Sequence, residues 1–354
     1  MPVNTSRTTY REHTDTENIL KLRQVLSTLP AFCKDYFRAI DSTTTTKTRI
    51  SYAYDIRIFF QFLLDENPAF KNYAMTDFSV AVLDQIKAVD LEEYMEYLKV
   101  YQNGDKTETN GERGLKRKIS ALRSFYAYYY KREIIHTNPT VLIDVPKIHD
   151  KSIIRLDTDE VALLLDYIEH CGDSLTGQKR VYYEKTKERD LAIVTLLLGT
   201  GIRVSECVGL DIEDVDFKNN GIKVTRKGGN EMVVYFGEEV EKALKRYLEV
   251  RAGITPLAGH EHALFYSAQR KRMGVQAVEN MVKKYSRQIT TTKKITPHKL
   301  RSTYGTALYQ ETGDIYLVAD VLGHKDVNTT KKHYAALDDA RRRQAATAVK
   351  LRED

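Results

Sequence analysis

The sequence predicts a mainly α-helical protein of two domains, the second of which contains a small antiparallel sheet. The chain has 354 residues, more than one domain of about 150 residues requires. Apolar residues recur at intervals of three and four along most of it, which is typical of amphipathic helices. A strand pair is indicated at 221–236, where two β-rich runs surround a Gly-Gly turn.

The N-terminal region predicts an arm and a helical domain. Residues 1–17 are polar and lack periodicity, so we expect a flexible arm. Residues 18–145 are expected to fold as an all-helical domain, because the helical pattern recurs at 17–30, 46–67, 90–103 and 113–135. The aromatic run at 125–130 is interpreted as core and rim of its helix rather than as a platform for bases.

The C-terminal region predicts a linker and a second domain. Residues 146–156 contain proline and charged residues without periodicity, as surface linkers do. A second domain then spans 157–354, beginning with a capping box at Asp157 or Thr158. It continues with an apolar helix around 187–201, the hairpin, and helices to the end, including a helical tail.

Composition narrows the class of protein. The net charge of +6 indicates a mildly basic protein, which by itself does not identify a partner. The three cysteines form no CxxC pair, so neither a disulfide framework nor a zinc site is indicated. The longest apolar run is far below the ~18 residues of a membrane span. We therefore expect a soluble, cytoplasmic protein with no membrane partner.

Four short motifs carry the functional signal: TGIRVSEC, RKGGN, TPHKLRSTYGT and LGHKDVNTTKKHY. Each alone fits an ordinary role, such as a surface ion pair, a solvated lysine, a helix cap, a turn or a packing tyrosine. Their candidate residues are, in order, Arg203, Glu206, Lys227, His298, Arg301, His324 and Tyr334.

Together these residue types suit attack of a tyrosine on a phosphodiester. Guanidiniums of Arg203 and Arg301 can bind the non-bridging oxygens in bidentate fashion. Imidazoles can donate to the same oxygens or accept the phenolic proton, since a free tyrosine with a pKa near 10 is mostly neutral. A lysine can protonate the leaving 5′ oxygen. The chain lacks a GxxxxGK[ST] loop and paired acidic motifs, so no ATP, metal or other cofactor is implied.

The ordered motifs resemble those of the tyrosine recombinase (phage integrase) family, in particular its Xer-type branch. Residues 188–217 are similar to the family's most typical catalytic block, and 48–63 and 117–139 to its helical, SAM-like core-binding domain. The resemblance implies a phosphate site of Arg203, Lys227, His298, Arg301 and His324, with Glu206 in support and Tyr334 as nucleophile. It also implies a 3′-phosphotyrosyl intermediate.

The resemblance further implies a DNA partner. The core-binding helices would face the major groove, and their basic residues are Lys47, Arg49, Lys116, Arg117, Lys118 and Arg123. A solvated face is the alternative interpretation of these residues. The family implies double-stranded DNA with inverted half-sites, a dimer on each site, a homo-tetramer on two sites, and a nucleoid-associated location. The C-terminal tail would dock on a neighbouring protomer, or else pack on its own domain.

Several points stay open in the sequence. At the hairpin, neighbours on a strand face opposite sides, so we predict that Lys227 points into the site and that Arg226 mainly binds DNA. Asn328 is expected to cap the helix that carries Tyr334. The role is chromosome dimer resolution or integration and excision of a mobile element. Alternatives are a type IB topoisomerase-like enzyme and a catalytically silent DNA-binding regulator.

Overall fold

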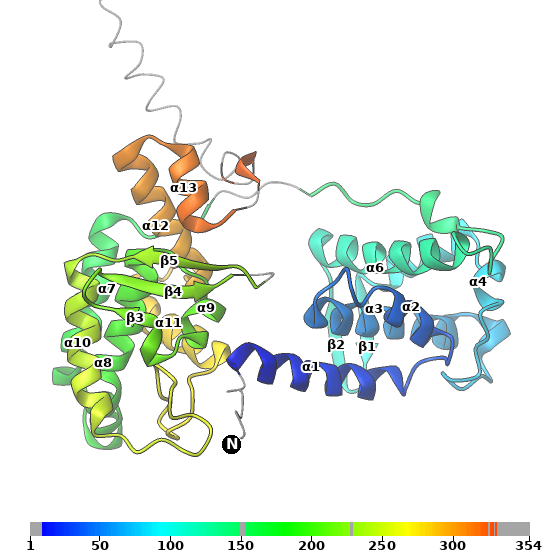
Figure 1. Ribbon diagram of the computed structural model, residues 1–354. Coiled ribbons are helices and arrows are strands. Elements are labelled where there is room, and N and C mark those ends of the chain that lie inside the picture. Colours follow the sequence, from blue (N-terminus) through cyan, green and yellow to red (C-terminus); the bar gives the residue numbers. More distant parts are fainter. Residues whose placement is uncertain (1–8, 149–152, 227–228, 325, 329, 331–354) are drawn as a thin grey trace, which may run out of the picture. The chain divides into compact units, whose positions relative to one another are not determined.

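The chain forms two compact units, Met1–Asp150 and Lys151–Asp354, and their division falls within the predicted linker. The structure is a computed structural model that describes residues 9–148, 153–226, 229–324, 326–328 and 330 (Figure 1). The predicted fold class is confirmed, with two mostly helical units and two small antiparallel sheets. Among the described residues, none of the helices has the length and apolarity needed to cross a membrane.

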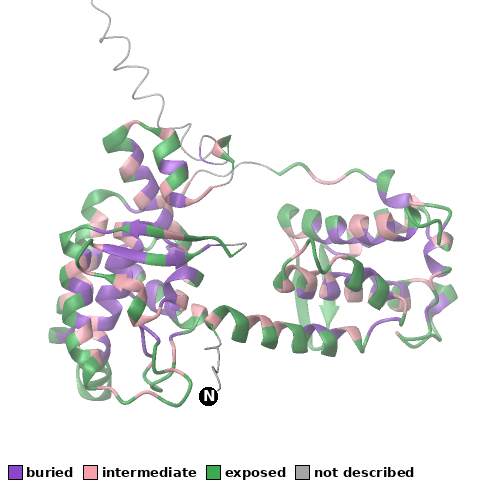
Figure 2. Cartoon of the chain, in the orientation of Figure 1, coloured by how far each residue is buried: buried purple, intermediate pink, exposed green. Residues whose placement is uncertain are grey.

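The first unit is a helical domain built on an aromatic core. Its helices are α1 (Tyr10–Leu26), α2 (Cys33–Ala39), α3 (Thr46–Glu66), α4 (Val82–Gln85), α5 (Ala88–Tyr97) and α6 (Glu112–Tyr130), with short 3-10 turns η1 (Pro68–Phe70) and η2 (Pro139–Val141). The predicted packing role of the aromatic run is confirmed. Phe125, Tyr126 and Tyr129 are buried, and the hydroxyl of Tyr129 donates to the Phe32 carbonyl at 2.7 Å. Figure 2 shows buried residues recurring along the helices of this unit.

Two expectations for this unit are wrong. The arm does not extend to residue 17, because α1 begins at Tyr10, where Thr9 and Glu12 form a capping box. The domain is also not all-helical, because β1 (Val100–Asn103) and β2 (Lys106–Thr109) form a hairpin. Gly104 has a φ of 61° in its turn, a conformation that glycine adopts without strain.

The second unit surrounds the long helix α8 (Gly177–Thr200), whose apolar segment 191–197 is buried. Helices α7 (Thr158–His170), α10 (Glu238–Ala252) and α12 (Pro297–Thr312) pack against it. Other helical elements among its described residues are η3 (Cys171–Ser174), α9 (Val204–Gly209), η4 (Ile212–Asp214), α11 (Val275–Ile289) and α13 (Ile315–Leu322). Helix α7 begins after Asp157, whose N–H donates to the Glu160 carboxylate, so Asp157 is the capping residue.

The predicted hairpin at 221–236 is confirmed as part of a three-stranded sheet. Its strands are β3 (Val215–Asp216), β4 (Gly221–Thr225) and β5 (Glu231–Tyr235), in that order, and Thr225 pairs with Glu231 at the end next to the connection between β4 and β5. Ile222, Val224 and Val234 are buried while Lys223 and Val233 are exposed. The sheet therefore has one face against the helices and one face in solvent.

Candidate active site

Arg203 and Glu206 form a partly buried ion pair at the start of α9. Nη1 of Arg203 lies 2.8 Å from Oε1 of Glu206, and the backbone N–H of Arg203 donates to Oε2 at 2.8 Å. The Glu206 side chain is only 4% exposed, against 36% for Arg203. The pair is thus not a surface ion pair. Glu206 caps α9 and also restrains the guanidinium that it neutralises.

Gly201 brings three helices together beside this pair. It ends α8 with a φ of 61°, and a Cβ there would lie 2.4 Å from the Tyr304 ring and 2.9 Å from the Leu322 side chain. Its carbonyl accepts from Nη1 of Arg301 at 2.5 Å. The absence of a side chain at Gly201 therefore lets α12 and α13 approach Arg203.

Arg301 is buried in α12, with 4% of its surface exposed. Its Nη2 donates to the Leu322 carbonyl at the end of α13. His298 lies on the first turn of α12, after Pro297, and is exposed. Residues three apart on a helix share a face, so His298 lies over the same side of α12 as Arg301.

His324 follows the left-handed residue that ends α13. Gly323 has φ 60° and ψ 50°, and the backbone N–H of His324 donates to the Ala319 carbonyl at 2.9 Å. This arrangement closes the helix and leaves its last carbonyls pointing outward. The Nδ1 atom of His324 lies 2.7 Å from Oγ1 of the buried Thr330. The imidazole is thereby oriented by the segment that follows it.

Arginine side chains contact the carbonyl oxygens at the C-terminal end of α13. Arg203 Nη2 lies 3.4 Å from the Gly323 oxygen, and Arg301 donates to the Leu322 oxygen. Arg226 donates to the Leu322 oxygen as well and, through Nη2, to the Val321 oxygen at 2.7 Å. Cations are favourable at a helix C-terminus because the helix dipole is negative there. The end of α13 thus gathers residues from four separate parts of the sequence.

The expectation that Arg226 faces away from the site and mainly binds DNA is wrong, and strand alternation therefore no longer supports the inward position predicted for Lys227. Arg226 is 8% exposed and lies beside Arg203 and Arg301 at the end of α13. The alternation of β4 continues past its last residue, since Arg226 follows the inward-facing Ile222 and Val224 at intervals of two. That apolar pair was the sequence signal that could have identified Arg226 as inward-facing.

The cluster is cationic in balance. Removal from water lowers the pKa of Arg226, and Arg203 lowers it further, whereas the carboxylates of Glu206 and Asp320 act in the opposite direction. Three guanidiniums therefore face two nearby carboxylates, one of them buried. An anionic group such as a phosphate diester would be attracted to this place.

Two predicted catalytic residues, Lys227 and Tyr334, lie outside the described residues. Of the segment before Tyr334, Val327, Asn328 and Thr330 are described as helical. The predicted cap Asn328 is wrong, because an Asp326 carboxylate oxygen accepts from the Asn328 N–H at 2.9 Å and Asp326 is therefore the capping residue. Within the described part of the chain, no group of three or more His, Cys, Asp or Glu side chains is placed to hold a metal ion.

The second unit matches the phage integrase family over residues 155–341. The chain belongs to the phage integrase family. It is 33% identical to the tyrosine recombinase XerC of Caldanaerobacter subterraneus subsp. tengcongensis over 328 residues, which cover 90% of this chain and 86% of the relative. It is 31% identical to XerS of Lactococcus lactis subsp. cremoris over 340 residues, covering 89% and 93%. The protein is a tyrosine site-specific recombinase of the Xer type.

Solved structures show that the fold is shared. A XerH recombinase bound to palindromic difH substrate has a TM-score of 0.65 and 20% identity, covering 98% of this chain and 90% of that one. The Tn1549 transposon integrase in complex with circular intermediate DNA has a TM-score of 0.62 and 21% identity, covering 88% and 98%.

In the first unit of the recombinase, three of the basic residues predicted to contact DNA are engaged within the fold. Lys118 is 6% exposed, and its ammonium lies 2.8 Å from the Asn110 amide oxygen. Arg123 donates to the carbonyls of residues 140 and 143. The Arg49 side chain is 11% exposed and pairs with Asp41. We therefore withdraw Arg49, Lys118 and Arg123 from the proposed DNA-contacting set.

Lys47, Lys116 and Arg117 remain in that set. All three are exposed. Arg117 is paired with the buried carboxylate of Asp55 but keeps 48% of its side-chain surface. Their exposure is compatible with contacts to phosphates.

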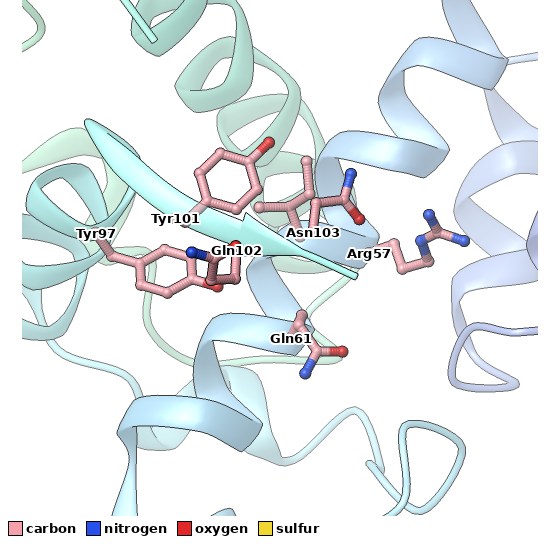
Figure 3. A pocket seen from close by; sticks show the side chains of 7 residues that line it. Arg57, Gln61, Tyr97, Tyr101, Gln102 and Asn103 are labelled. Carbon is pink, nitrogen blue, oxygen red and sulfur yellow. The ribbon is translucent and has the colours of Figure 1, made fainter. Parts of the chain in front are cut away.

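A polar pocket also lies in the first unit, between α3 and β1 (Figure 3). It is lined by Arg57, Ile58, Gln61, Tyr97, Tyr101, Gln102 and Asn103. None of the motif residues lines it, so it is separate from the candidate active site.

Proposed function

We propose that this recombinase cuts and rejoins duplex DNA through a 3′-phosphotyrosyl intermediate, with Tyr334 as the nucleophile. The observation that supports the proposal most strongly is the meeting of Arg203, Arg301 and the turn that carries His324 at the C-terminal end of α13. These groups come from segments far apart in the chain. Their shared chemistry is the binding of an oxyanion.

The proposed reaction is a transesterification at phosphorus. The Tyr334 oxygen forms a bond to phosphorus while the bond from phosphorus to the 5′ oxygen breaks, and Lys227 gives its proton to the departing oxygen. Negative charge that develops on the non-bridging oxygens is bound by Arg203 and Arg301. The imidazoles of His298 and His324 donate to the same oxygens or accept the phenolic proton.

Strand exchange follows when the cleavage step is reversed with the 5′ hydroxyl of a different DNA strand. A freed 5′ hydroxyl attacks the phosphotyrosyl bond, loses its proton to the site, and releases the tyrosine. No net hydrolysis occurs, so the reaction needs no external energy source. Glu206 supports both steps because it holds the Arg203 guanidinium at 2.8 Å.

The proposed partner is double-stranded DNA with two inverted half-sites, bound by a dimer on each site and a tetramer on two sites. Recombinases of the same fold have been solved with DNA, namely XerH with difH and the Tn1549 integrase with circular intermediate DNA. Lys47, Lys116 and Arg117 are proposed to contact phosphates, which makes the affinity salt-dependent. The biological role is chromosome dimer resolution or mobile-element integration and excision, which the genomic neighbourhood distinguishes.

A nicked suicide substrate tests the mechanism. Wild-type protein should form a covalent complex on a substrate whose cleaved product diffuses away, and Tyr334→Phe should bind the same DNA equally well without forming that complex. The reason is that phenylalanine lacks the attacking oxygen but keeps the ring. The readout is a shifted band on a denaturing gel.

Three other outcomes contradict parts of the proposal. Cleavage retained by Tyr334→Phe would place the nucleophile elsewhere. Tight binding by wild type without any covalent complex would favour a silent DNA-binding regulator. Relaxation of supercoiled plasmid by a monomer, without exchange between two sites, would favour a topoisomerase-like enzyme.

A further inference from the structure

The end of α13 is held by a residue that the catalytic motifs do not include. We propose that Arg226 is a positioning residue for the recombination reaction, which orients the Gly323–His324 turn and the Leu322 carbonyl that it shares with Arg301. This proposal rests on the proposed function of the site. It assigns Arg226 no contact with the reacting phosphorus.

The contacts of Arg226 lie directly before the turn. Its Nη2 atom is 2.7 Å from the Val321 oxygen, and Nη1 donates to the Leu322 oxygen. These carbonyls belong to the two residues that precede Gly323. Arg226 therefore binds the last turn of α13 through two bonds, in the fork geometry that a lysine cannot reproduce.

The guanidinium also lies against the backbone of Gly323. A Cβ on Gly323 would be 1.9 Å from Nη1 and 2.5 Å from Cζ of Arg226. Gly323 thus lacks a side chain for two reasons, its φ of 60° and the space that Arg226 occupies. The turn and the arginine fit each other closely, so a change in either should displace the other.

The shared carbonyl connects Arg226 to the catalytic residues. The Leu322 oxygen accepts from Nη1 of Arg226 and from Nη2 of Arg301. Arg203 reaches the next carbonyl, that of Gly323, at 3.4 Å. Loss of Arg226 would free one side of this carbonyl group and so alter the position of both catalytic guanidiniums and of His324.

A rival role for Arg226 is direct binding of the phosphate. Its Nε atom is buried and has no hydrogen-bond partner among the residues that the structure describes. That donor could meet an incoming oxygen. The two roles predict different responses to the charge of the substrate, and the experiment below separates them.

The first arm of the test removes the guanidinium but keeps the length of the side chain. Arg226→Met should bind site DNA within about twofold of wild type, whereas its rate of covalent-complex formation should fall about 10²-fold, the size expected for a small misplacement of catalytic groups. Arg251→Met is the matched control, because Arg251 also donates to backbone carbonyls, those of residues 263 and 264 at 3.1 Å, in another part of the unit. It should keep the wild-type cleavage rate.

The second arm uses a methylphosphonate at the scissile position, which replaces one charged non-bridging oxygen by a methyl group. A variant that lost a phosphate-binding cation is relieved by this substrate, because less charge must be stabilised. Arg203→Ala and Arg301→Ala should therefore be partly restored, and Arg226→Met should not. Restoration of Arg226→Met to the extent seen with Arg203→Ala would overturn the positioning role in favour of phosphate binding.

The third arm does not depend on catalysis. In protein with ¹³C-labelled histidine, the ring resonance of His324, assigned with His324→Gln, should shift in Arg226→Met and stay in place in Arg251→Met. If Arg226→Met does not fold, Gly323→Ala displaces the same guanidinium from the other side and should give the same shift. An unmoved His324 resonance would refute the proposal, even if wild-type protein forms no covalent complex and the proposed function itself fails.

Discussion

At the scale of the residue, Arg226 and Lys227 are neighbours in the sequence between β4 and β5, and we propose a different role for each. Arg226 directly follows β4, is buried, and donates to carbonyls of α13. Lys227 lies outside the described residues, and its role as general acid remains a proposal. Its support is chemical, since an ammonium can release a proton at a pH where a guanidinium hardly does.

The general-acid role predicts a specific rescue. Lys227→Ala should lose about 10²–10⁴-fold in cleavage rate on normal DNA, the usual contribution of general acid–base catalysis. Replacing the bridging 5′ oxygen by sulfur makes a leaving group that needs no proton, so this substrate should restore Lys227→Ala. Cleavage rates on paired oxygen and sulfur substrates give the comparison.

Arg203→Ala is the control for that experiment, because its defect concerns the non-bridging oxygens and should persist with sulfur. Rescue of Arg203→Ala, or failure to rescue Lys227→Ala, would show that the acid has been assigned to the wrong residue.

At the scale of the element, α6 shows how helical periodicity sorts basic residues that are adjacent in sequence. Leu115, Lys118 and Leu122 lie on its buried face, while Lys116 and Arg117 are exposed. Burial lowers the pKa of Lys118, which the nearby Asp55 opposes. Burial likewise raises the pKa of Asp55, which Arg117 and Lys118 oppose. The carboxylate of Asp55 and the cations of Arg117 and Lys118 therefore stabilise one another within the first unit.

The two lysines of α6 should therefore respond differently to substitution. Lys116→Ala should weaken DNA binding and reduce the slope of log affinity against log salt by about one unit, because one phosphate contact is lost. Lys118→Met should leave that slope unchanged but lower the free energy of unfolding by about 1–3 kcal/mol, since the Asn110 oxygen loses its buried donor.

Fluorescence anisotropy at several salt concentrations measures the slope, and urea unfolding measures the stability. A salt slope that falls for Lys118→Met while its stability is unchanged would return Lys118 to the DNA-contacting set.

At the scale of the whole molecule, the proposed activity requires more than one copy of the chain. The described residues that we propose for catalysis lie in the second unit, and those that we propose for contacts with DNA lie in the first. We propose that several protomers act together in the exchange between two sites. The C-terminal tail, which lies outside the described residues, is proposed to link them.

Truncation after Leu337 tests that link while it keeps Tyr334. The shortened protein should bind a single half-site with unchanged affinity, yet lose cooperative binding to a full site and lose recombination between two sites. Gel-shift titrations on half-sites and full sites, with a plasmid recombination assay, provide the readouts. Synapsis at full efficiency by the truncated protein would exclude the docking role of the tail.

Local patterns in the sequence predicted the helical class, the hairpin at 221–236 and the order of the motif residues, because periodicity and turn chemistry depend on neighbours in the chain. The capping box at Thr9 and Glu12 and the turn at Gly104 are equally local signals, which sequence reasoning missed. The places of Arg226, Arg123 and Arg301 depended on tertiary structure. Each of these guanidiniums donates to a carbonyl, and every residue has a carbonyl, so no side-chain pattern marks the partner. The carbonyl oxygens bound by Arg226 belong to residues 95 and 96 positions after it in the chain, and only folding brings them within hydrogen-bonding distance.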